Sequence, residues 1–323
     1  MKELKNVRSV YSVVLALLAW FGLQFSYAQA PMRVIIEPNS VSICRDEQLL
    51  LRYCYRDVPY KPYVQRLFSP QGVNILRDAP ADHKHHHALM FAVAVDGVNF
   101  WEETPTAGRQ EHGGFTDVVI AEHGGGPSAG FTERLGWIDS TGRGVLTEHR
   151  TIEVCQVDKL GPTMLAWRSD LAVPKGKESL TLTGSHYFGL GMRFLRSMDG
   201  AGEFSNADGK DGTVFRGEEK LVRSNWCAYT ATANGKPVTV AMLGHPSNPR
   251  DSTTWFTMTK PFAYLSATLA LHEEPLKIAS SAPLVLRYAV VLWDGDIQAA
   301  QIEHLYREWI KRIGEAKSAK QSG

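Results

Sequence analysis

The sequence predicts an all-β protein: an antiparallel β-sandwich, in the size range of a large super-sandwich, with one C-terminal α-helix. Three observations lead to this prediction. Before residue 295, apolar residues alternate with polar ones or form short β-rich runs. The dipeptides Asp96-Gly97 and Asn234-Gly235 are typical of two-residue hairpin turns. Helical periodicity is confined to the end of the chain, and no strand–helix alternation predicts a parallel sheet.

The strand candidates follow one another at short intervals, separated by clusters of Gly, Pro, Asp and Asn. They are residues 41–44, 49–55, 89–95, 144–154, 163–171, 179–182, 192–195, 264–269 and 284–292. The turn at Asp96-Gly97 pairs Val95 with Val98. Continued along the same two strands, this register pairs Val93 with Phe100 and Ala92 with Trp101, so that large side chains face small ones.

The helix follows Asp296, where the apolar spacing changes to that of one helix face. The apolar positions are 302, 305, 306, 309, 310 and 313. We expect this helix to pack on the outside of the sheets. No Pro/Ser-rich linker interrupts the chain, which predicts a single β-sandwich domain over residues 31–315 and a disordered tail over residues 316–323.

Residues 1–28 have the features of a secretory signal peptide. Lys2, Lys5 and Arg8 give a basic start, an uncharged apolar run follows, and Ala28-Gln29-Ala30 supplies small residues at a cleavage site. The run is too short to favour a membrane span, and an uncleaved N-terminal anchor is the alternative. We therefore expect a periplasmic or secreted protein that begins at Gln29.

The charge balance and the cysteines limit the partners and the cross-links. The formal net charge is +1, which gives no reason to expect a nucleic acid or an anionic membrane as partner. Four cysteines permit three disulfide pairings in an oxidising compartment. The alternative is buried free thiols in a domain large enough to fold without cross-links. The cysteines are Cys44, Cys54, Cys155 and Cys227.

The segment Asp82-His83-Lys84-His85-His86-His87 gathers four imidazoles and one carboxylate directly before an apolar strand. Pro80 indicates that the segment begins as a loop and enters the sheet near His86 or His87. A carboxylate fixes the tautomer of a histidine and raises its basicity, which serves proton transfer or metal binding. The alternative is a solvated loop with one or two buried histidines. The clustering favours a site in which His85, His86 and Asp82 are catalytic and His83 and His87 contact substrate.

Other segments supply further candidates, which we expect to join the histidines in one cleft. His112 follows Gly108 and precedes two glycines, and we expect it to be a fourth catalytic residue. Substrate oxygens are expected to contact Arg193 in YFGLGMRF, His245 and Asn248 in GHPSNPR, and Glu148 in LTEHRTIEV. Glu148 can instead form a simple ion pair with Arg150. His123, before three glycines, is a further candidate, with a mobile loop as an equal alternative.

Three features bear on the chemistry. His85, His87 and His112 can converge on a metal, although no ready-made metal motif occurs and the sequence identifies no cofactor. No Gly-x-Ser-x-Gly motif supports a nucleophilic serine. Most of the tryptophans are expected in the core, and one or two lining a cleft would suit stacking on a sugar.

Several of these segments resemble a bacterial family of unknown function, DUF6807, whose members are called PmoA-like. The resemblance covers most of the chain after residue 28. It is carried by KPYVQRLFSPQGVNILRDAPADHKHH, VDGVNFW, YFGLGMRF, GHPSNPR and RYAVVLWDG. This chain departs from the family motif Asp-His-Pro-His-His-Arg-Gly at three positions, with Lys84 for the proline, His87 for the arginine and Ala88 for the glycine.

The resemblance implies a secreted β-sandwich associated with carbohydrate metabolism and a histidine-rich concave site. It does not imply methane oxidation, because a membrane-bound monooxygenase subunit needs several apolar spans and this chain has one short apolar segment. Three functions remain. The first is an enzyme acting on a sugar or glycoside, as a hydrolase, lyase or epimerase. The second is a non-catalytic carbohydrate-binding module, and the third is a cupin-type metal-dependent oxygenase.

Overall fold

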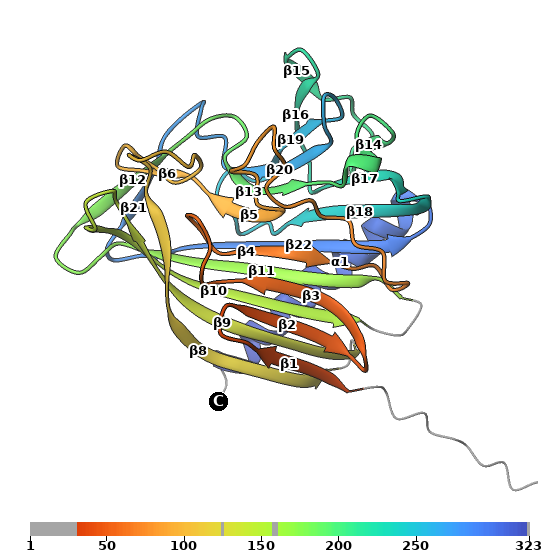
Figure 1. The fold of residues 1–323 in the computed structure, drawn as a ribbon, viewed down its shortest axis with the longest axis horizontal. Coiled ribbons are helices and arrows are strands. Elements are labelled where there is room, and N and C mark those ends of the chain that lie inside the picture. The colour runs from red at the N-terminus through yellow and green to blue at the C-terminus, as the bar shows by residue number, and fades with distance from the viewer. Residues whose placement is uncertain (1–30, 124–125, 157–160, 322–323) are drawn as a thin grey trace, which may run out of the picture.

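The computed structural model describes residues 31–123, 126–156 and 161–321. They form two large antiparallel sheets, a small third sheet and one long helix (Figure 1). This arrangement confirms the prediction of an all-β sandwich with a C-terminal helix. The predicted signal peptide, residues 1–28, lies outside the described residues, so its prediction stands as such.

The first large sheet has ten strands and positions the candidate site. Their order across the sheet is β1 (Met32–Ile36), β2 (Ser40–Arg45), β3 (Gln48–Cys54), β4 (Tyr63–Leu67), β5 (Leu89–Ala92), β13 (Gly189–Arg193), β20 (Tyr264–Thr268), β19 (Thr254–Met258), β16 (Glu219–Arg223) and β15 (Thr213–Arg216). The strand predicted at 192–195 lies three residues earlier, because Gly189–Arg193 pairs with β5 on one side and β20 on the other.

The second large sheet has eight strands, several of them long. Their order is β14 (Glu203–Asn206), β17 (Trp226–Ala233), β18 (Lys236–Gly244), β22 (Leu284–Asp294), β11 (Thr163–Ala172), β10 (Gly144–Gln156), β9 (Gly126–Ile138) and β8 (Arg109–His123). Strand β10 buries every second side chain from Leu146 to Gln156, as a strand between a core and solvent does. The hairpin predicted at Asn234-Gly235 joins β17 to β18, and both turn residues have positive φ.

The third sheet contains four short strands, and it shows where one predicted strand was wrong. Their order is β21 (Leu276–Ala279), β12 (Ser179–Thr183), β6 (Ala94–Val95) and β7 (Val98–Asn99). The turn at Asp96-Gly97 and the pairing of Val95 with Val98 are confirmed. However, residues 89–95 split at Val93 between two sheets. Ala92 pairs with Gly189 of β13 instead of Trp101, because β5 is hydrogen-bonded within the first sheet.

Aromatic rings fill the space between the two large sheets. The ring of Trp137 lies 5.9 Å from that of Phe91 and 4.8 Å from that of Phe100, and Tyr53 lies 5.1 Å from Phe131. Five tryptophans are at most 1% exposed, so they serve the core and line no cleft. They are Trp101, Trp137, Trp167, Trp226 and Trp255.

Helix α1 (Ala299–Gln321) covers the outer face of the second sheet, as predicted (Figure 1). Ile302, Tyr306 and Trp309 pack against Trp226 and its neighbours on β17, β18 and β22. The helix continues into residues 316–321, which the sequence predicts to be a tail. None of the helices in the described part of the chain is long and apolar enough to cross a membrane.

All four cysteines are free thiols, which agrees with the expectation of free thiols and not with that of disulfide pairing.

Candidate functional site

The histidines lie in a closed loop that connects β4 to β5. Asp78 and His87 form an antiparallel bridge at its stem, and the Ala79 amide donates a hydrogen bond to the His86 carbonyl (3.0 Å). Two turns follow each other inside the loop, from Pro80 to His83 and from His83 to His86. All four histidines therefore lie before β5, which begins only at Leu89 and not near His86 or His87 as expected.

The stem of the loop contains a row of alternating charges. His87 Nδ1 lies 2.9 Å from Asp78 Oδ1, and its Nε2 lies 2.8 Å from Glu103 Oε1. Glu103 also accepts a hydrogen bond from Lys61 Nζ at 2.9 Å. Burial disfavours the imidazolium, but the two carboxylates outweigh burial and raise the pKa of His87. The side chain of His87 is only 3% exposed, so it stabilises the loop. It is too enclosed to make the substrate contact that the sequence predicts.

The structure shows why arginine and glycine suit two of the positions at which this chain departs from the family motif. Position 87 lies between two carboxylates, and a protonated His87 provides the cation that the arginine of the motif would provide. Ala88 has a φ of 43°, in the left-handed region that favours glycine. The arginine and glycine of the motif are therefore the residues that this backbone and this charge pattern favour.

His86 lies beneath the loop, against Arg193 from the end of β13. Its Nδ1 is 3.4 Å from Arg193 Nη1, and the residue is 7% exposed. Burial, with the neighbouring His85, His83 and Arg193, lowers the pKa of His86 to about 2, so the ring is neutral at physiological pH. Arg193 in turn donates to Asp82 Oδ2 at 2.8 Å and stacks on Phe262, with its guanidinium carbon 3.5 Å from the ring centroid.

His83 and His85 form the accessible side of the loop. His83 stacks on His86 with ring centroids 4.7 Å apart, and its Nδ1 lies 3.1 Å from Asp82 Oδ2. Although burial opposes it, the hydrogen bonds from Arg193 and His83 lower the pKa of Asp82. His85 Nδ1 lies 3.5 Å from Glu102 Oε2, and these side chains are 22% and 37% exposed. Burial lowers the pKa of His85, with Glu102 opposing the shift. The predicted grouping of Asp82, His83, His85, His86 and Arg193 is thus found in space.

Three buried polar atoms near His86 have no hydrogen-bond partner among the described residues. They are Trp101 Nε1, Arg193 Nε and Tyr264 Oη. Tyr264 and Trp101 pack closely over Gly191 of β13: a Cβ at that position would be 2.1 Å from Tyr264 Oη and 3.1 Å from the Trp101 ring. Burial also raises the pKa of Tyr264, so its hydroxyl keeps its proton. This side of the site therefore has a fixed aromatic floor.

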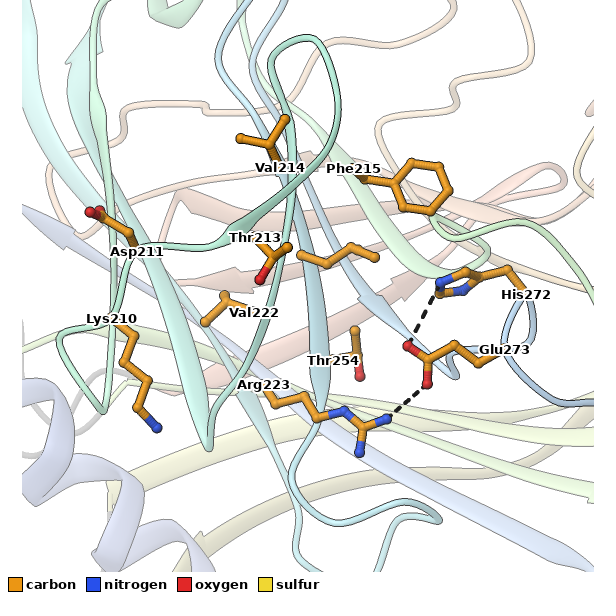
Figure 2. Close-up of a pocket in the computed structure, with 11 residues that line it drawn as sticks. Lys210, Asp211, Thr213, Val214, Phe215, Val222, Arg223, Thr254, His272 and Glu273 are labelled. Carbon is orange, nitrogen blue, oxygen red and sulfur yellow. Dashed lines mark hydrogen bonds and ion pairs between the residues drawn. The ribbon is translucent and has the colours of Figure 1, made fainter.

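A cavity of about 490 Å³ lies farther along the same sheet, at its β15–β16 edge (Figure 2). Its wall includes the exposed Phe215 and an ion pair between Arg223 Nη2 and Glu273 Oε2 at 3.0 Å. His272 Nε2 lies 3.8 Å from the other Glu273 oxygen. The loop histidines do not line this cavity.

A series of aromatic contacts connects this cavity to the histidine loop. Phe215 stacks on His186 at 3.8 Å, and His186 contacts Tyr187 at 5.0 Å. Tyr187 lies 5.3 Å from Trp101, which lies 6.2 Å from His86. The loop and the cavity are therefore two parts of one side of the first sheet.

Two predicted site residues belong instead to a polar network between the two large sheets. Arg150 donates to both oxygens of Glu148, and both side chains are fully buried. Arg150 also donates to Tyr53, whose hydroxyl donates to Glu133 at 2.5 Å. The other Glu133 oxygen lies 2.5 Å from Nδ1 of His112. His112 and Glu148 thus belong to one network, linked through Glu133, Tyr53 and Arg150, and they do not join the histidine loop. The alternative that Glu148 forms an ion pair with Arg150 is confirmed.

The segment GHPSNPR lies on the other side of the molecule, beside the helix. His245 contacts Trp309 of α1 with ring centroids 5.7 Å apart. The Asn248 side chain donates to the Arg287 carbonyl and accepts from its amide, both at 2.8 Å. Asn248 therefore holds this loop to β22 by two hydrogen bonds. The prediction that His245 and Asn248 join the histidine loop was wrong. The side chain of His123 lies outside the described residues.

Metal binding gains no support from the ligands. In the part of the chain that the structure describes, no three His, Cys, Asp or Glu side chains are placed to hold an ion. His87 directs both nitrogens at carboxylates, and His112 lies with Glu133 between the sheets. The predicted convergence of His85, His87 and His112 does not occur.

Sequence reasoning missed the residues that complete the site from distant segments. Glu102 and Glu103 follow the confirmed hairpin. They lie close to the histidine loop because β7 ends at Asn99, and the sequence does not indicate this end. Phe262 and Tyr264 precede and begin β20. The only local signal in the cavity segments was the exposed Val214-Phe215 pair in an otherwise polar stretch.

The fold and the site define an all-β sandwich protein with a histidine loop, held by ion pairs, on one sheet. The model of a family of unknown function, DUF6807, matches residues 40–307, and the chain belongs to this family. Among curated proteins, none matches this chain in sequence. The family description carries no activity, and the PmoA-like name gains no support.

Several solved α-galactosidases are similar to this chain in fold at a low level. The galactosidase domain of the α-galactosidase–sucrose kinase AgaSK has 9% identity and a TM-score of 0.46, with 81% of this chain and 42% of that chain covered. The α-galactosidase AgaA from Geobacillus stearothermophilus has 9% identity, a TM-score of 0.43 and coverage of 82% and 41%. The enzyme from Lactobacillus brevis has 7% identity, a TM-score of 0.45 and coverage of 82% and 39%. The chain thus spans less than half of these structures, and their activity is not carried over.

Proposed function

We propose that this protein is an enzyme acting on a sugar or a glycoside, with the histidine loop as its acid–base centre. The observation that carries the proposal is the His85–Glu102 pair. Its two side chains are partly exposed, 3.5 Å apart at Nδ1 and Oε2, and lie beside the fixed Arg193–Asp82 pair. A reachable imidazole with a carboxylate on one nitrogen is the arrangement that proton transfer needs.

The lowered pKa of His85 favours the neutral ring, which accepts a proton from a substrate hydroxyl or carbon. Glu102 faces Nδ1, so transfer occurs at Nε2, and the carboxylate then stabilises the imidazolium. Elimination and epimerisation of sugars include such a step, and in hydrolysis the same base takes the proton from the attacking water. His86 is too buried and too difficult to protonate to share it.

Asp82 and His83 provide the contacts for substrate hydroxyls. The side chain of Asp82 is 44% exposed, and its lowered pKa keeps it an acceptor. Arg193, 1% exposed, fixes that carboxylate from below. A hydroxyl both donates and accepts hydrogen bonds, so adjacent acceptor and donor groups suit a polyhydroxylated ligand.

The test combines a panel of neutral glycosides and free sugars with product detection by NMR. His85→Gln and Glu102→Gln are expected to lower turnover about 10²–10⁴-fold, the usual contribution of one acid–base group, with an unchanged melting temperature. His149→Gln, an exposed histidine on the second sheet, is the control. Wild-type turnover in both site variants would refute the proposal.

A non-catalytic carbohydrate-binding protein is the second candidate. The closed Arg193–Asp82 ion pair favours it, since a pair already satisfied within the protein is suited to binding more than to chemistry. Calorimetry on the same panel decides between the two. Saccharide binding that Asp82→Asn abolishes, without turnover of any compound, would establish the binding protein.

A further inference from the structure

We infer that the cavity at the β15–β16 edge is a second saccharide-binding site, and that the ligand is a neutral oligosaccharide whose other end lies at the histidine loop. The inference rests on the proposed function and narrows its substrate class. The cavity, of about 490 Å³, has the volume of a small-molecule site and combines one aromatic ring with several polar side chains.

Phe215 provides a fixed aromatic face. The residue is 48% exposed, yet its ring stacks on His186 at a centroid distance of 3.8 Å and an interplanar angle of 23°. His186 is itself buried and held by Glu219 Oε2, which lies 2.9 Å from its Nε2. An exposed ring that cannot rotate freely offers a large contact area at a low entropic cost. The apolar face of a sugar ring is a ligand that such a surface accommodates.

The polar groups around Phe215 match hydroxyls. Arg223 and Glu273 form a half-exposed pair, with accessible fractions of 52% and 50%. Thr213 and Thr254 line the same cavity (Figure 2). Nδ1 of His272 is buried without a hydrogen-bond partner among the described residues. Planar donors and acceptors side by side can bind two neighbouring hydroxyls of one sugar.

The charge of the cavity selects a neutral ligand. Two cations, Lys210 and Arg223, are balanced by two anions, Asp211 and Glu273. A phosphate or a polyanionic sugar would therefore gain no net attraction from the wall and would meet two carboxylates. The observations favour an uncharged saccharide over an anionic one.

The distance between the cavity and the histidine loop sets the length of ligand that can reach both. Successive ring contacts from Phe215 through His186, Tyr187 and Trp101 to His86 are 3.8 to 6.2 Å apart. Three of these rings, His186, Trp101 and His86, are buried and line no groove, but four contacts of about the length of a sugar residue or less put the two ends within reach of a tetrasaccharide that lies above them. A mono- or disaccharide bound at the histidine loop does not reach Phe215, whereas a tetrasaccharide can occupy both ends.

The test measures the affinity of the full chain for neutral mono-, di- and tetrasaccharides of one linkage by calorimetry. In the wild type, affinity should increase from the shortest to the longest ligand that binds. Phe215→Ala should weaken tetrasaccharide binding roughly 2- to 10-fold, the equivalent of about 0.5–1.5 kcal/mol for one aromatic contact, and leave the shorter ligands unaffected. Arg223→Ala should act in the same way. Val119→Ala, an exposed apolar residue on β8, is the matched control.

The outcomes separate this inference from the proposed function. Short saccharides that bind and are lost with Asp82→Asn, together with tetrasaccharide affinity unchanged in Phe215→Ala and Arg223→Ala, would refute the second site and leave the loop function intact. A wild-type affinity that does not increase with length has the same meaning. No binding of any saccharide would refute both. A uniform loss at every length in Phe215→Ala, with a lowered melting temperature, would also refute the second site.

Discussion

At the scale of single residues, His87 shows how one side chain can link loop structure to pH. It faces Asp78 and Glu103, with Lys61 beyond Glu103 and the ring of Tyr63 at 4.6 Å. Because the folded state raises its pKa, its contribution to stability is complete below the ordinary histidine pKa of about 6.5. That contribution is lost as the pH rises through the folded-state pKa.

We therefore predict that the stability of the wild type relative to His87→Arg falls from mildly acidic to alkaline pH; the other histidines, including His85 and His86 with their lowered pKa values, contribute equally to both proteins and cancel in this difference. An arginine stays charged over the whole range, and it is the residue of the family motif. His87→Gln should cost about 3–5 kcal/mol near neutral pH, because it leaves two partly buried carboxylates without their shared cation. Urea denaturation of the three proteins at several pH values provides the measurement. Parallel pH curves for wild type and His87→Arg would contradict the prediction.

His86 is the residue for which the structure changes the expected result most. If His86 were an accessible catalytic residue, as the sequence suggested, His86→Ala would remove function while the melting temperature moved little. Because His86 is 7% exposed and stacked under His83, we now predict a loss of about 1–3 kcal/mol in the free energy of unfolding together with any functional loss. His85→Gln, by contrast, should leave stability unchanged. Equal stability of His86→Ala and wild type in urea would show that the buried position is wrong.

The residues of the site were predictable only where they are neighbours in the sequence. The segment from Asp82 to His87 indicated by composition alone that several imidazoles would meet. The segment alone could not identify Glu102 and Glu103 as partners of His85 and His87, because these glutamates are distant in the sequence and lie beside the loop only in the folded protein. Asn248 and His245 looked like site residues because turn chemistry and binding chemistry use the same side chains.

At the scale of secondary-structure elements, strand β13 carries the floor of the site. Gly191 leaves room for Tyr264 and Trp101 to lie on the strand, and a Cβ there would be 2.1 Å from Tyr264 Oη. We predict that Gly191→Ala lowers the free energy of unfolding by about 1–3 kcal/mol, as overpacking does, and weakens saccharide binding by displacing these rings.

The matched control for Gly191 is Gly136→Ala on β9. A Cβ at Gly136 has no atom within 4 Å, so this change should be neutral or stabilise by about 0.4–1 kcal/mol. Thermal denaturation and calorimetry on the two variants give the comparison. If Gly191→Ala is as stable as Gly136→Ala and binds normally, the packing of Tyr264 and Trp101 over β13 does not define the site.

Turns were the best predicted elements, and the assignment of strands to sheets was the worst. Asp96-Gly97 and Asn234-Gly235 encode positive φ locally, and both turns occur as expected. The split of residues 89–95 at Val93 has no local signal, because it depends on β13 pairing with one half and β12 with the other. Strand β8 escaped prediction because its sequence contains HGG, where the structure has a register shift between His112 and Phe115.

At the scale of the whole molecule, the two large sheets are held together by a mainly apolar core and by buried polar contacts, the largest set of which is the network around Arg150. That network ties β3, β8, β9 and β10 through Tyr53, His112, Glu133 and Arg150. No disulfide contributes, since all four cysteines are free. We predict that the urea midpoint is the same with and without reductant. A loss of about 2–5 kcal/mol on reduction would instead reveal a structural disulfide.

The predicted signal peptide bears on the compartment of the protein. We propose that residues 1–28 are a signal peptide and that the folded protein is periplasmic or secreted, since a basic start, a short apolar run and small residues at Ala28-Gln29-Ala30 are what signal peptidase substrates share. Expression in a Gram-negative host should yield periplasmic protein whose N-terminus, by sequencing, is Gln29 or Pro31. Leu17→Arg, which places a charge in the apolar run, should retain the uncleaved chain in the cytoplasm. A wild-type product that keeps Met1 and sediments with membranes would show that the segment is an anchor.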